Sequence, residues 1–207
     1  VSRQRSSWQY QFEDPIHTVI CPSNETAMCI TANVIVALSV ESGDQLFRNA
    51  SVLTTLRHSY GPVAEYDGTW IQGVANSQDL LIVAHLQLYH IPEVDNDSQE
   101  TGGYGDDAED LWVSAINVQS GIEVWSKELY ACGKMEPCFE YSKNSGLIFV
   151  ATEWCCSEPC GEFFALDVVT GQVVIEFNLK AKVMKQLRAV DDYLVMVTDE
   201  QKDSVEP

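Results

Sequence analysis

The chain has 207 residues, and 12 Lys+Arg against 31 Asp+Glu give a formal charge of 12 − 31 = −19. A surface this negative repels phosphate backbones and anionic lipid head groups, which excludes nucleic-acid and membrane-surface binding as functions. No apolar run approaches the roughly 18 residues that a membrane-spanning helix needs. With 45% hydrophobic residues, the composition is typical of a folded chain, so we expect one large or two small soluble domains.

Cysteines and glycosylation motifs indicate an oxidising compartment. Seven cysteines are many for a cytosolic chain of this size, in which thiols stay reduced. Asn24, Asn49 and Asn96 each begin an N-x-S/T acceptor sequence for N-linked glycans. The first residue is Val1, without an initiator Met or a signal peptide, which favours a processed or trimmed polypeptide. We expect a glycosylated, disulfide-bonded protein that is secreted or lies in an organelle lumen.

Short runs of Val, Ile, Leu and aromatic residues recur along the chain and predict β-strands. Turn-forming residues separate the runs, as at 41–44, 144–146 and 169–172. No segment keeps a convincing helical period, and the best candidate, 181–190, is short and lacks caps. The chain is therefore predicted to be all-β, with strands at 18–21, 34–40, 80–89, 111–118, 147–152, 163–169, 173–177 and 193–198.

Three segments align with one another without gaps. They begin at Ala37, Ala115 and Ala165 and share the pattern A-[LI]-[SND]-V-x-[ST]-G-x-x-[VL]-[FWI]. In this pattern a strand ends in a small polar residue, and Ser or Thr followed by Gly makes a tight turn with positive φ. A second strand then places a bulky apolar residue. A repeat of fixed form predicts a repeated architecture.

The shared pattern resembles the tryptophan-docking repeat of the PQQ-like, or quinoprotein alcohol dehydrogenase-like, β-propellers, A-x-D-x-x-T-G-x-x-x-W. In that family the turn joins the third and fourth strands of a four-stranded blade, and the Trp packs between neighbouring blades. The copy at Ala165 keeps the Ala, Asp, Thr and Gly of the pattern, and the copy at Ala115 keeps the Trp. The resemblance implies blade docking through Ala37, Gly43, Phe47, Ala115, Gly121, Trp125, Ala165, Asp167, Thr170, Gly171 and Ile175.

Strand counting against this resemblance predicts a propeller portion with three complete four-stranded blades and an incomplete blade at each end. The complete blades are expected at about 15–50, 61–129 and 135–179, and two strands of a partial blade at 181–199.

Two further features follow from this count. The segment 90–110 is rich in Asp and Glu, so we expect an acidic loop inserted within the second blade and suited to basic partners. Residues 7–12 are predicted to be a fourth strand that carries Trp8. The incomplete ends favour a portion of a larger ring. A four-bladed ring closed by the Trp8 strand, or two chains that complete eight blades, are the alternatives.

The cysteines fall into groups that suggest turn-closing disulfides. Cys21 and Cys29 flank a short hairpin turn, which predicts a bridge between them. Cys132 and Cys138 bracket a blade junction in the same way, and the remaining cysteines are Cys155, Cys156 and Cys160. Because seven is odd, at least one thiol is free or pairs with another chain. The adjacent pair resembles the vicinal disulfide over the cofactor of quinoprotein dehydrogenases, and zinc bound by Cys132, Cys138, Cys155 and Cys160 is a second alternative.

Metal and catalytic motifs are weak. The acidic segment offers calcium candidates, but it lacks the Gly and the final Glu of a calcium-binding loop. The weak candidates are Asp95, Asp97, Asp106 and Asp107. No G-x-S-x-G motif occurs, and the four histidines have no motif partner. We therefore expect no bound cofactor, with calcium and PQQ as the alternatives.

The resemblance implies a non-enzymatic scaffold. Members of this superfamily without cofactor display blade edges and loops to protein partners. The expected partners are other protein subunits or a second copy that completes the propeller. Two alternatives stay open: a fragment of a PQQ- and calcium-dependent quinoprotein oxidoreductase, and a calcium-dependent extracellular structural module.

Overall fold

The computed structural model describes residues 8–50, 53, 65–77, 79–90, 107–129, 138–152, 161–179, 182–190 and 193–200. The strands of this part of the chain are β1 (Thr18–Ile20), β2 (Thr26–Ile30), β3 (Ile35–Ser39), β4 (Gln45–Asn49), β5 (Glu65–Ser77), β6 (Leu80–His90), β7 (Asp107–Asn117), β8 (Glu123–Leu129), β9 (Cys138–Ser142), β10 (Leu147–Ala151), β11 (Glu162–Asp167), β12 (Val173–Asn178), β13 (Lys182–Val190) and β14 (Tyr193–Glu200). No helix in these ranges is long and apolar enough to cross a bilayer.

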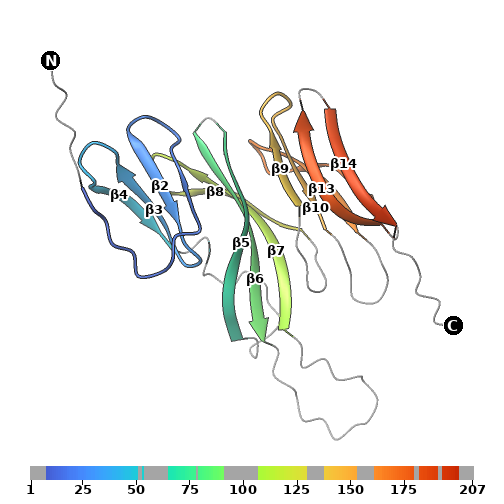
Figure 1. Ribbon diagram of the computed structural model, residues 1–207, viewed down its shortest axis with the longest axis horizontal. Helices are drawn as coiled ribbons and strands as arrows, with labels where there is room; N and C mark the ends of the chain where they lie inside the picture. The colour runs from blue at the N-terminus through green and yellow to red at the C-terminus, as the bar shows by residue number, and fades with distance from the viewer. Residues whose placement is uncertain are drawn as a thin grey trace, which may run out of the picture.

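The strands form antiparallel sheets in strict chain order. β1–β4, β5–β8 and β9–β12 are four-stranded sheets, and β13 pairs with β14 alone. Figure 1 shows the sheets side by side, with the sheet of β1–β4 at one end of the row and β13 and β14 at the other. Each sheet is a meander of neighbouring strands, which is the arrangement of a propeller blade. The prediction of an all-β propeller portion with three complete blades is therefore confirmed.

The cores lie between the blades. Met28 and Ile35 of the first blade pack with Leu81 and Val83 of the second. The opposite face of the second blade supplies a core shared with the third, which includes Ile82, Val113, Ile148, Val150 and Phe164. Successive residues of β6 enter different cores because side chains alternate across a strand. The middle strands are therefore apolar on both faces, as the continuous runs of the sequence indicate.

Two expectations about the chain's irregular segments need correction. The acidic insert is shorter than 90–110, because His90 pairs with Asp107 and Gln87 pairs with Asp110 at the ends of β6 and β7. Residues 91–106 lie outside the described residues. The segment from Trp8 to Phe12 forms no ladder with a sheet. Instead Tyr10 and Phe12 pack as a strap on the outer face of the first blade, against Cys29, Val34, Val36 and Leu38.

Candidate interaction surface

The three repeated segments form turns of one geometry. In each turn the Gly N–H donates to the carbonyl four residues earlier, at 2.8 Å for Gly43, 2.9 Å for Gly121 and 2.8 Å for Gly171. The three glycines have φ of 78°, 70° and 68°. A residue with a side chain adopts this backbone conformation only at a cost in free energy, so the positive φ of these turns favours glycine.

The side-chain oxygen of the residue that begins each turn accepts hydrogen bonds from backbone N–H groups of that turn. Asp167 Oδ1 accepts the Thr170 N–H at 2.8 Å, its hydroxyl at 2.9 Å and the Val169 N–H at 3.0 Å. Asn117 Oδ1 accepts the equivalent bonds from Gln119 and Ser120. These bonds lower the pKa of Asp167, with the Thr170 backbone N–H as the largest cause. Asp and Asn are interchangeable here because only one side-chain oxygen is used.

A β-bulge follows each turn at the same place. Ala37 pairs with Phe47, Ala115 with Trp125 and Ala165 with Ile175, and each register shifts immediately afterwards. A bulge re-aims the strand that carries it. The small alanine leaves room beside its partner, so each bulge directs the bulky residue across the face of its blade.

Each docked ring rests on the turn glycine of the next blade. A Cβ added to Gly43 would lie 2.6 Å from the ring of Trp8, and one added to Gly171 would lie 2.5 Å from the ring of Trp125. Phe47 stands against Gly121 in the same way. The glycines are therefore needed twice, for their positive φ and for the space that the ring occupies.

The docked tryptophans also form a hydrogen bond across the blade boundary. Trp8 Nε1 donates to the Val40 carbonyl at 2.8 Å, and Trp125 Nε1 donates to the Val168 carbonyl at 3.1 Å. Phe47 has no donor, but Asn49 Nδ2, two residues later, donates to the Gly121 carbonyl at 2.6 Å. All three docking turns therefore hold a residue from the preceding segment.

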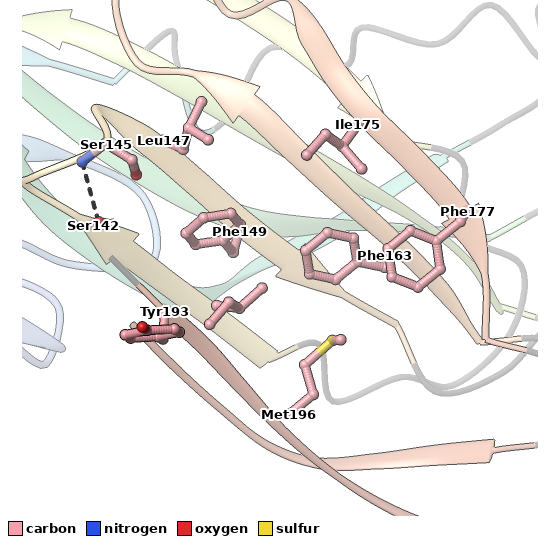
Figure 2. A pocket seen from close by; sticks show the side chains of 10 residues that line it. Ser142, Ser145, Leu147, Phe149, Phe163, Ile175, Phe177, Tyr193 and Met196 are labelled. Atoms are coloured by element: carbon pink, nitrogen blue, oxygen red, sulfur yellow. Dashed lines mark hydrogen bonds between the residues drawn. The ribbon is translucent and has the colours of Figure 1, made fainter. Parts of the chain in front are cut away.

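The fourth docking residue lacks such a turn among the described residues. Ile175 is 46% exposed, and Phe177, on the same face of β12, is 40% exposed. Both line a groove of about 300 Å³ between the third blade and β14. Figure 2 shows Phe149, Phe163 and Phe177 in a row along the floor, with Tyr193 and Met196 from β14 on the other wall. The ring centroids of Phe163 and Phe177 are 4.7 Å apart.

The predicted Cys21–Cys29 disulfide is not formed. Both residues are free thiols, Cys21 exposed and Cys29 buried. The hairpin register places Cys29 opposite Val19 rather than opposite Cys21. The two cysteines are thus diagonal neighbours on one face, at a separation too large for a bridge without backbone movement. Burial, and then the neighbouring Cys21, raises the pKa of the Cys29 thiol.

The other cysteines leave disulfide pairing unassigned. Cys138 begins β9 and is half-buried. Its expected partner Cys132 lies outside the described residues, as do Cys155, Cys156 and Cys160. The Cys132–Cys138 bridge and the alternatives drawn from the vicinal pair stay predictions.

The glycosylation candidates differ in their surroundings. Asn24 is exposed in the turn between β1 and β2. Asn49 is half-buried, and its amide is already bonded to Gly121. Asn96 lies outside the described residues. Of the two described asparagines, Asn24 is therefore the more accessible, and glycosylation at either stays a prediction.

The calcium candidates lie at the edge of the described chain. Asp107 is the first residue of β7, and Asp95, Asp97 and Asp106 lie outside the described residues. Elsewhere in the described ranges, no three His, Cys, Asp or Glu residues are grouped to hold a metal ion. Glu162, the first residue of β11, pairs with Asn178 of β12, and its pKa is raised by burial and secondarily by Glu176.

Two parts of this surface were missed by sequence reasoning. The rings of the strap residues Tyr10 and Phe12 pack with centroids 4.8 Å apart and planes tilted by 53°, and the Tyr10 hydroxyl donates a hydrogen bond to Gln45 Oε1 at 2.7 Å. Their alternation with glutamines predicts a strand, which the structure does not form. The second is Phe177. The strand registers place Asn49 of the first blade and Lys127 of the second at the position equivalent to Phe177. A comparison of the blades could therefore have identified Phe177 as an unusual apolar residue.

Comparisons with known proteins find resemblance in fold only. No family model matches the chain, and no curated protein matches it. Among solved structures, the uncharacterized protein lmo1340 from Listeria monocytogenes EGD-e aligns over 83% of this chain and 42% of its own, with 13% identity and a TM-score of 0.45. The WD40 domain of SCAP from fission yeast aligns over 89% of this chain and 38% of its own, with 10% identity and a TM-score of 0.37.

A quinohemoprotein alcohol dehydrogenase, ADHIIG from Pseudomonas putida HK5, aligns over 91% of this chain and 39% of its own, with 10% identity and a TM-score of 0.33. The chain thus spans less than half the length of each of these three structures. The class of protein rests on the chain's own sheets: it is a β-propeller-type protein with blades in chain order.

Proposed function

We propose that the chain is a non-enzymatic protein-interaction scaffold of PQQ-like propeller blades, part of a larger ring or assembly in an oxidising compartment. The observation that carries this proposal is the contrast between three occupied docking turns and the open groove beside Ile175. The two strands β13 and β14 cover only part of the outer face of the third blade. Other strands are needed to bury the rest.

The PQQ-like assignment is supported by how the turns are used. Each Ser/Thr-Gly turn of the three repeated segments receives a bulky residue from the preceding segment on its glycine. That is the relation that the resemblance implies for A-x-D-x-x-T-G-x-x-x-W. The third turn, with Asp167, Thr170 and Gly171, uses all three of these polar and glycine positions in its hydrogen bonds.

The native mass tests the scaffold proposal. The polypeptide is recovered from its source under mild conditions, and its mass is measured by light scattering and again after denaturation. We expect a native particle heavier than 23.1 kDa, either because other subunits are bound or because a longer polypeptide completes the ring. A native particle of that mass, without any bound polypeptide, would contradict the proposal.

Two measurements test the scaffold proposal against the two alternative functions. A quinone absorbance band from the unfolded native material would favour the oxidoreductase alternative. An increase in melting temperature on adding calcium would favour the calcium-dependent module, because a ligand that binds the native state stabilises it. We expect neither.

The oxidising compartment is tested through the glycan. When the chain passes through a eukaryotic secretory pathway, Asn24 is expected to carry an N-glycan that endoglycosidase removes, with a corresponding mass shift. Asn24→Gln should abolish that shift, and Asn49→Gln, in which the bonded amide is replaced, should leave it unchanged. Native material without a glycan at Asn24 would count against this compartment.

A further inference from the structure

We draw no further inference here: the strongest candidate, the apolar groove between the third blade and β14, belongs to the surface on which the proposed function already rests, and nothing in the described part of the chain shows what covers it.

Discussion

The outer faces of the first and third blades are both apolar, but different kinds of segment cover them. On the outer face of the first blade, Tyr10 and Phe12 of the strap cover the apolar residues, and Trp8 fills the turn at Gly43. On the outer face of the third blade, β13 and β14 cover one part, and Ile175 and Phe177 remain exposed. The strap thus ends in a ring docked on a turn glycine, whereas the two-stranded sheet leaves the docking residue Ile175 without such a turn among the described residues.

The strongest test of this comparison truncates a docked side chain in one variant and an undocked side chain in another. Trp125→Ala should lower the free energy of unfolding by about 3–5 kcal/mol, because it removes a large packed ring. The loss includes its bond to the Val168 carbonyl. Ile175→Ala, at the equivalent position without a turn, should cost less than about 1 kcal/mol in the isolated chain. Urea unfolding followed by fluorescence and circular dichroism measures both, and equal losses would show that the open groove is not a vacant docking place.

A second test separates the ring from the backbone at the turn. Gly171 and Gly146 have similar φ, 68° and 66°. A Cβ on Gly171 meets the Trp125 ring at 2.5 Å, whereas one on Gly146 meets only Val168 at 3.9 Å. Gly146→Ala should cost about 1–2 kcal/mol for the left-handed conformation alone, and Gly171→Ala about 2–4 kcal/mol because the ring must also move.

The same unfolding experiments measure this difference. If the two alanine variants were equally stable, the ring at Gly171 would not be tightly docked in solution.

Much of this fold could be predicted from local sequence features, such as the residues that a tight turn requires. The turn at Gly171 was found because a tight turn with positive φ needs glycine and its Asp and Thr close the turn locally. β5 was missed because Gly68 and Gly73 interrupt its apolar alternation at positions where its register shifts. Bulges of this kind depend on the neighbouring strand, so the local pattern is weak.

The candidate surface could be predicted only in part. The docking residues lie in the repeat, but exposure of Phe177 depends on which segment covers β12, and strand alternation does not contain that information. The Cys21–Cys29 prediction was wrong because a turn's length decides which residues lie opposite one another. A diagonal pair and an opposed pair have nearly the same spacing in the sequence. Tyr10 and Phe12 have the alternation of a strand, and only the three-dimensional contacts identify them as a strap.

The strap itself can be opened by a smaller perturbation. Trp8→Ala removes the ring on Gly43 and the bond to the Val40 carbonyl, and it should cost about 1–2 kcal/mol because Trp8 is partly exposed. The loosened strap should uncover Cys29, which is 6% exposed, and lower its raised pKa toward the ordinary value. More thiolate then forms at mildly alkaline pH, and the thiol reacts faster.

Peptide-level mass spectrometry of alkylated protein follows each cysteine separately. In the wild type, exposed Cys21 should react well before Cys29. In Trp8→Ala the alkylation rate of Cys29 should rise several-fold, because greater exposure and a lower pKa both increase its reactivity. The alkylation rate of Cys21 should stay constant. An unchanged Cys29 rate would mean that the strap does not depend on the docked Trp8.

The smallest expected effect concerns the charge in the third turn. Hydrogen bonds hold the pKa of Asp167 below its usual value of 3.8, so its contribution to stability is complete above that value and is lost as the pH falls through the folded-state pKa. Asp167→Asn keeps the acceptor oxygen that Asn117 uses in the second turn but cannot titrate. The stability difference between wild type and Asp167→Asn should therefore shrink between about pH 5 and about pH 2. The reciprocal variant, Asn117→Asp, should acquire the same pH dependence in a turn that lacks it, because the two turns share one hydrogen-bond pattern. Melting temperatures of the three proteins across this range measure the effect, and a pH dependence in Asp167→Asn equal to that of the wild type would assign it to other carboxyl groups.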